Sequence, residues 1–192
     1  GIQCIHYNAK GMFLMSEIEF EKAAMLKEKP DVSKIGFGTH FTDYMFEMDY
    51  SKEKGWHDAR ILPYADIKVS PANTTPHYGQ AVFEGMKAYR QGNKVAIFRP
   101  MDHLRRMENS CRLLVIPEFP LEAVHEGLKQ LVALEKAWVP EKKGQSLYIR
   151  PFIFATDPFL GVSVSDTYTL LIILSPVAAY YAHGFAPVKI MV

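Results

Sequence analysis

The chain has 192 residues, of which 48% are hydrophobic and 22% charged, with a formal net charge of +1. This length and composition are typical of one packed domain or slightly more, and they exclude intrinsic disorder. The near-zero net charge gives no reason to expect nucleic acid or an anionic membrane as a partner. No signal peptide or membrane-spanning run is evident, and Cys4 and Cys111 are too far apart for metal-ligand spacing, so we expect a reducing cytoplasm.

In the N-terminal part of the chain the spacing of apolar residues changes once, from a helical to a strand period. Met15 and the residues after it resemble a natural start, so we assign residues 1–14 to an upstream or added segment. From Ser16 the apolar spacing predicts a short amphipathic helix that ends at Pro30. Residues 41–49 then predict a strand, residues 51–55 a turn, and residues 60–63 a second strand.

The central part predicts a hairpin followed by two helices. Residues 86–90 and 95–98 form the expected hairpin around a Gly-containing turn. Pro100 opens a helix on which Leu104, Met107, Cys111 and Leu114 share one face. A second helix follows Pro120 and ends before Pro140, and its predicted inward face carries Val124, Leu128, Leu131, Ala133, Leu134 and Trp138.

Two further strands are predicted at residues 147–155 and 168–174, which makes the fold class α+β, a mixed or antiparallel sheet with two packed helices. Residues 175–187 are rich in Ala, Tyr, Gly and Pro, as expected of a linker. We therefore divide the chain into the segment 1–14, a small α+β domain at 15–176, and a linker at 177–192 that begins a further domain.

From the residues alone, the candidate functional side chains have ordinary explanations. Arg106 lies off the apolar stripe of its helix and would be solvated, as would Arg105. Tyr148 and Arg150 are two positions apart on a strand, so both project from one sheet face. Phe83 would be a core residue. His77 would be a loop residue, and His103 and His125 lack metal-ligand spacing.

Three motifs nevertheless occur together in a characteristic order. They are His77-Tyr78-Gly79-Gln80-Ala81-Val82-Phe83-Glu84-Gly85-Met86-Lys87, then Leu104-Arg105-Arg106-Met107, then Ser146-Leu147-Tyr148-Ile149-Arg150-Pro151. In this arrangement the chain resembles the N-terminal half of the branched-chain amino acid aminotransferases, pyridoxal phosphate (PLP) enzymes of fold type IV. The resemblance runs from about Ile35 to Val192. It implies the small N-terminal domain of such an enzyme.

The resemblance also implies a role for individual residues. Arg106 would bind the PLP phosphate, because its planar fork suits phosphate oxygens. Tyr148 and Arg150 would line the substrate pocket, with Arg150 holding the substrate carboxylate. The other implied substrate-binding residues are Phe37, Tyr78, Phe83, Leu160, Val162 and Tyr180. Of these, Phe83 would wall the aliphatic side chain, and Tyr78, Leu160 and Val162 would reach the active site of the neighbouring subunit of a homodimer.

By the same resemblance, the reaction would transfer the amino group of leucine, isoleucine or valine to 2-oxoglutarate. PLP would be the cofactor, and the lysine that binds it would lie beyond Val192, so these 192 residues alone are expected to be inactive. Neither Lys87 nor Lys189 matches that lysine.

Two kinds of alternative are open. Within fold type IV, D-amino acid aminotransferase and aminodeoxychorismate lyase share the phosphate arginine, but they lack the combination of residues 37–43 with Tyr148-Ile149-Arg150-Pro151. Outside catalysis, the chain could be an orphan domain that dimerises. Transaminase activity would exclude the orphan domain.

Overall fold

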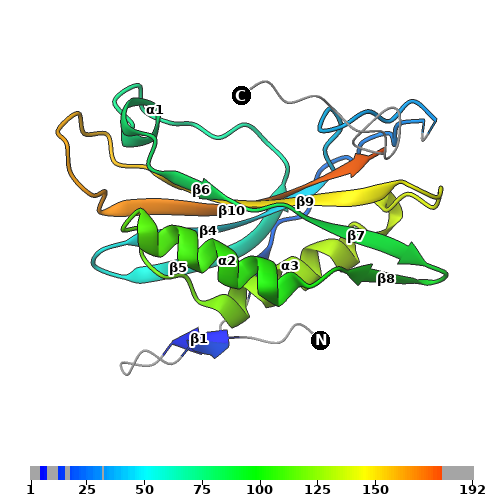
Figure 1. Cartoon of the computed structure of the whole chain (residues 1–192), viewed down its shortest axis with the longest axis horizontal. Helices are drawn as coiled ribbons and strands as arrows, with labels where there is room; N and C mark the ends of the chain where they lie inside the picture. The colour runs from blue at the N-terminus through cyan, green and yellow to red at the C-terminus, as the bar shows by residue number, and fades with distance from the viewer. Residues whose placement is uncertain (1–4, 8–12, 16–17, 32, 179–192) are drawn as a thin grey trace, which may run out of the picture.

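The computed structural model describes residues 5–7, 13–15, 18–31 and 33–178. Within this part of the chain, eight strands form one mixed sheet in the order β3-β5-β4-β10-β9-β7-β8, with β6 also pairing with β9 (Figure 1). The strands are β3 (Glu19–Phe20), β4 (Tyr44–Ser51), β5 (Gly55–Pro63), β6 (Ala81–Phe83), β7 (Met86–Gln91), β8 (Lys94–Ile97), β9 (Ser146–Ala155) and β10 (Thr167–Val177). Among the strands of the described residues, β3 and β5 pair in parallel, and the other pairs of this sheet are antiparallel. Strands β1 (Ile5–Tyr7) and β2 (Phe13–Met15), from the predicted upstream segment, form a separate antiparallel pair.

Helices α2 (Pro100–Leu113) and α3 (Leu121–Leu134) cover one face of the sheet, as Figure 1 shows, and a short helical turn at Lys136–Trp138 follows α3. The main core lies between these helices and the sheet. Members from both layers are fully buried, and they include Leu104, Met107, Leu128, Leu131, Phe46, Ile149, Ile153 and Leu170. Alternation along the strands places every second side chain in this core.

The opposite face of the sheet, called here the open face, carries no long helix from the described part of the chain (Figure 1). Residues 64–67 run along it, against Phe152 and Leu171. The short helix α1 (Thr74–Tyr78) stands at one end of this face. Asn73 caps its first turn by accepting a hydrogen bond from the Thr75 amide at 2.8 Å, and Gly79 ends it with a φ of +66°.

The α+β class, the hairpin, both long helices and both long C-terminal strands are confirmed. Leu114, Ala133 and Leu134, which we predicted to face the core, are exposed, because Leu114 and Leu134 lie at helix ends and Ala133 faces away from the sheet. Helix α1 and strand β6 were not predicted, since the His77 region was expected to be a loop. The predicted boundary at 176–177 falls at the end of β10, and most of the proposed linker lies outside the described residues.

The helix predicted from Ser16 to Pro30 is wrong. The structure has the two-residue strand β3 there, followed by irregular backbone. The backbone amides bond to distant partners instead of to carbonyls one turn back: Glu21 to the Ile61 carbonyl at 2.9 Å, and Lys27 to Asp43 Oδ1 at 2.6 Å. Tertiary hydrogen bonding has therefore overridden the local periodicity.

Candidate functional site

Tyr148 and Arg150 form a hydrogen-bonded pair on the open face of β9. Arg150 donates from Nε and Nη2 to the Tyr148 hydroxyl oxygen, at 3.2 Å and 2.8 Å. Their common face follows from the two-residue period of the strand, while Ile149 between them points into the core with no exposed surface. The predicted placement of both side chains on one face is confirmed.

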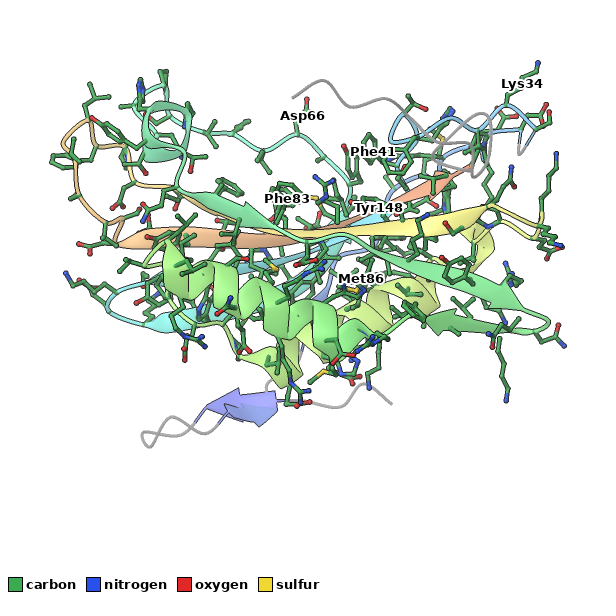
Figure 2. The ribbon with its side chains drawn as sticks, viewed as in Figure 1. Lys34, Phe41, Asp66, Phe83, Met86 and Tyr148 are labelled. Carbon is green, nitrogen blue, oxygen red and sulfur yellow. The ribbon has the colours of Figure 1, made fainter. Side chains whose placement is uncertain are left out.

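Two aromatic residues from other parts of the chain join this pair. The Phe83 ring lies over the guanidinium, with its centroid 4.4 Å from Arg150 Cζ. The Phe37 ring packs on the Tyr148 ring with their centroids 5.2 Å apart. Figure 2 shows Phe83 and Tyr148 on the open face of the sheet, whereas Met86 lies between the sheet and the helices. Four of the predicted site residues are therefore assembled in one place, and Phe83 is not the core residue that the pattern alone predicted, since it is 63% exposed.

Gly85 lies directly against Tyr148 of this cluster. A Cβ atom at this position would lie 2.4 Å from the Tyr148 hydroxyl oxygen and 3.1 Å from its Cζ. Any larger residue would displace the hydroxyl that holds Arg150. The sequence alone did not indicate the role of Gly85, because its contact Tyr148 lies 63 positions further along the chain and no local pattern predicts that contact.

Arg106 is paired with Glu84 rather than being merely solvated. From α2, its Nε and Nη2 atoms donate to the two Glu84 carboxylate oxygens, each at 2.6 Å, while 64% of the arginine side chain stays exposed. The Glu84 side chain is only 6% exposed. Burial alone would raise the pKa of Glu84, but hydrogen bonds from Arg106 and the Gly85 amide, together with the charge of Arg106, outweigh it and lower that pKa. His103, one helical turn before Arg106, lies 3.7 Å from Glu84.

Glu84 and Gly85 lie in the short break between β6 and β7, and they connect the two groups of residues. The Glu84 amide donates to the Pro151 carbonyl at 2.9 Å, next to Arg150, while its side chain holds Arg106. Lys87, two residues beyond Gly85, is the register partner of Tyr148 and shares its sheet face. Lys87 was assigned no role in the site from the sequence, although its alternation with buried Met86 indicates the open face.

Tyr78, Leu160 and Val162 form a second group at the end of the sheet that carries α1. The Tyr78 hydroxyl donates a short hydrogen bond to the Leu160 carbonyl. The three side chains are 46%, 58% and 88% exposed, so a cluster of apolar surface lies here. Tyr180, another predicted substrate-binding residue, lies outside the described residues.

The described ranges contain neither a metal-binding cluster nor a membrane-spanning helix. These residues contain no group of three or more His, Cys, Asp or Glu side chains suited to hold a metal ion. Among the helices within the same ranges, none is long and apolar enough to cross a membrane.

A family model for "Amino-transferase class IV" matches residues 81–183, which is just over half of the chain and includes Phe83, Glu84, Arg106, Tyr148 and Arg150. The chain belongs to the class IV aminotransferase family. The class IV membership implied by the resemblance is thereby confirmed.

Curated relatives of this class IV aminotransferase chain carry a more specific name. The present chain is 57% identical over 168 residues to a probable branched-chain-amino-acid aminotransferase of Staphylococcus epidermidis. This match covers 87% of this chain and 47% of that protein. It is 53% identical over 177 residues to branched-chain-amino-acid transaminase 1 of Bacillus subtilis, covering 91% and 50%. The chain thus spans about half the length of the curated relatives it matches.

Solved structures agree on the fold. A branched-chain aminotransferase from Thermoproteus uzoniensis, crystallised with norvaline, has a TM-score of 0.54 at 23% identity, covering 68% of this chain and 40% of that one. The branched-chain amino acid aminotransferase from Escherichia coli has a TM-score of 0.52 at 24% identity, covering 71% and 41%. At these identities the likeness establishes the fold of the class IV chain and nothing finer.

Proposed function

We propose that the complete protein is a branched-chain amino acid transaminase, which transfers the amino group of leucine, isoleucine or valine to 2-oxoglutarate. One observation carries the proposal: the guanidinium of Arg150 is held in place by Tyr148 and lies beside the rings of Phe37 and Phe83. The names of relatives more than 50% identical support the same choice of substrates.

Arg150 would bind the carboxylate of the amino or oxo acid. Its flat fork matches a planar carboxylate, and the hydrogen bonds to Tyr148 reduce its freedom before the substrate arrives. The orientation of the substrate matters because the reaction moves a proton at its α-carbon. Holding the carboxylate next to that carbon fixes where the α-carbon lies.

Phe37 and Phe83 would contact the aliphatic side chain. Leucine has three more carbons than alanine, and burial of each contributes about 0.8 kcal/mol. Full burial of these carbons therefore favours leucine by about 2.4 kcal/mol, or roughly 50-fold in affinity.

The residues around Arg106 fit the phosphate of PLP. Glu84 engages Nε and Nη2 of Arg106, and no hydrogen bond is recorded for Nη1 within the described ranges. An open hollow of about 240 Å³ lies beside it, lined by Phe98, Arg99, Asp102, His103 and Arg106. An exposed, oriented guanidinium is a suitable phosphate ligand. When bound, PLP supplies an electron sink for the charge that develops at the substrate α-carbon.

The rest of the proposal concerns what surrounds this domain. The lysine that binds PLP would lie in a following domain, beyond Val192. The exposed group of Tyr78, Leu160 and Val162 would reach the active site of a second subunit, because exposed apolar clusters of this kind mark interfaces. A cytoplasmic location fits the free, buried thiol of Cys111.

The test uses the complete gene product with PLP. We expect glutamate to form from 2-oxoglutarate with leucine, isoleucine or valine as donor, and Arg106→Gln to weaken PLP binding about 10- to 150-fold through loss of charged hydrogen bonds. Arg105→Gln is the matched control, because Arg105 is an exposed neighbour on the same helix. D-alanine as the preferred donor would favour a D-amino acid aminotransferase. Absence of any transamination would favour a non-catalytic domain.

A further inference from the structure

We propose that Glu84 is a positioning residue for Arg106: its buried carboxylate fixes the guanidinium so that the Nη1 end faces the phosphate of PLP. This inference rests on the proposed function and deepens it, because it names the residue that gives the phosphate-binding arginine its orientation. Glu84 would act through Arg106 and would not touch the cofactor itself.

The pairing of Arg106 with Glu84 restrains the guanidinium along one edge. Nε donates to Glu84 Oε1 and Nη2 donates to Oε2, each at 2.6 Å. Two parallel bonds of this kind fix the plane of the guanidinium as well as its position, which a single bond cannot do. Within the described ranges Nη1 makes no recorded hydrogen bond, and the other recorded contact of Nη2 is a long one, 3.4 Å to His103 Nδ1. The Nη1 end is therefore available to a phosphate.

Glu84 is held more firmly than the arginine that it orients. Its side chain is 6% exposed, whereas that of Arg106 is 64% exposed. The Glu84 amide donates to the Pro151 carbonyl on β9 at 2.9 Å, and the Gly85 amide donates to Glu84 Oε2 at 3.2 Å. An exposed arginine side chain otherwise samples many rotamers. Glu84 therefore ties a surface cation to the sheet.

Glu84 lies where a side chain from the sheet meets α2. It comes two residues after Val82, whose side chain is 7% exposed and belongs to the main core. Strand alternation therefore turns Glu84 towards the face of the sheet that the helices cover, as it does Val82. A carboxylate buried at such a position is costly unless a cation pairs with it. Packing alone does not explain an acid here, and its grip on the guanidinium does.

The charge of Glu84 and its geometry act in opposite directions on a bound phosphate. As a negative charge near Arg106, the carboxylate repels the phosphate and would weaken the binding of PLP. As a fork that fixes the guanidinium, it strengthens binding, because the arginine has less freedom to lose when the phosphate arrives. Removal of the carboxylate should therefore weaken PLP binding if orientation dominates, and strengthen it if Glu84 contributes only charge.

The test compares two ligands of the complete protein after PLP has been removed from it. They are PLP itself and pyridoxal, which has the same ring and aldehyde but no phosphate, and the readout is the ratio of their dissociation constants in absorbance titrations. Glu84→Gln keeps the size of the side chain and loses the charge, whereas Glu84→Asp keeps the charge and withdraws the carboxylate by one methylene. Glu108→Gln is the matched control, because it removes a negative charge from the helix of Arg106 without removing the partner of that arginine.

We expect both Glu84 variants to reduce the preference for PLP over pyridoxal about 3- to 30-fold, the upper value corresponding to the full rotamer freedom of an arginine side chain. The affinity for pyridoxal should stay unchanged, which also shows that the variants fold. The preference should be unaffected in Glu108→Gln. In an Arg106→Gln background, Glu84→Gln should have no further effect on the preference, because Glu84 acts through the arginine.

A preference that is unchanged or increased in either Glu84 variant would overturn the inference and leave the rest of the proposed function standing. Loss or equal weakening of both ligands would also overturn it, since a purely structural role predicts that result. A parent protein that binds PLP but transaminates no branched-chain amino acid would overturn the proposed function, while the two variants would still decide the inference. A parent protein with no preference for PLP over pyridoxal would overturn the inference together with the phosphate role of Arg106.

Discussion

Gly85→Ala is the smallest substitution that tests how the candidate site is built. The added Cβ would lie 2.4 Å from the Tyr148 hydroxyl oxygen, so the hydroxyl must move by about 1 Å to reach ordinary contact at 3.4 Å. Gly85 does not have the positive φ that only glycine adopts readily, so the backbone itself accepts alanine. The expected effect is therefore steric and acts on the tyrosine.

Its magnitude follows from the bonds that the shift breaks. The Tyr148 hydroxyl accepts from Arg150 at 2.8 Å and 3.2 Å, and moving it away by about 1 Å takes these contacts out of hydrogen-bonding range. A hydrogen bond from a charged donor contributes about 1.5–3 kcal/mol. We therefore expect kcat/KM for leucine to fall about 10- to 150-fold in the complete protein, since Arg150 would lose its orientation.

Steady-state kinetics of a double-mutant cycle checks the mechanism. If Gly85→Ala acts through the hydroxyl, then Gly85→Ala combined with Tyr148→Phe should be little worse than Tyr148→Phe alone. Gly36→Ala is the control, because a Cβ there meets only Thr39 Oγ1, at 3.8 Å. Full activity of Gly85→Ala, or additive losses in the double variant, would refute the reasoning.

Three further predictions concern the core. Burial raises the pKa of Glu135 from 4.5 to about 7, so the folded state favours the protonated acid. The free energy of unfolding should therefore fall by about 3 kcal/mol as the pH rises from 4.5 to 7. In urea unfolding, the Glu135→Gln variant should not show this decrease of the free energy of unfolding with pH. Burial also raises the pKa of the Cys111 thiol to about 12, so in a Cys4→Ser background a thiol reagent should react only upon unfolding, and rapid labelling of the folded protein would contradict this. Gly127→Ala places a Cβ 2.4 Å from the buried Phe46 ring, and this overpacking of up to about 3 kcal/mol outweighs the helix propensity gain of about 1 kcal/mol. The thermal unfolding midpoint of Gly127→Ala should therefore fall. A rise would show that the Phe46 ring moves aside at little cost.

The parts of the site that the sequence predicted are those governed by a short period. Tyr148 and Arg150 were placed on one face because a strand alternates every two residues, and Leu104, Met107 and Cys111 were placed in the core because a helix repeats every 3.6. Assigning a phosphate role to Arg106 needed the family resemblance, because a surface arginine on a helix has no distinctive local pattern.

The parts that the sequence did not predict depend on partners far along the chain. The residues after Ser16 have helical spacing, yet Ala23 donates its amide to the Tyr44 hydroxyl at 3.1 Å and Lys27 donates to Asp43. Glu84 has no local sign of its role, because its partner Arg106 lies 22 positions further on. Predicting such contacts requires knowledge of the order of the strands in the sheet, which neither periodicity nor composition provides.

The break between β6 and β7 therefore couples the two halves of the candidate site. Phe83, Glu84 and Gly85 are consecutive, yet they contact Arg150, Arg106 and Tyr148 respectively. The bond from the Glu84 amide to the Pro151 carbonyl fixes this tripeptide against β9. Because neighbouring residues cannot separate, the positions of Arg106 and Arg150 are linked through a few covalent bonds of this tripeptide. A shift of this tripeptide would disturb both arginines at once, so substitutions here should alter cofactor and substrate binding together.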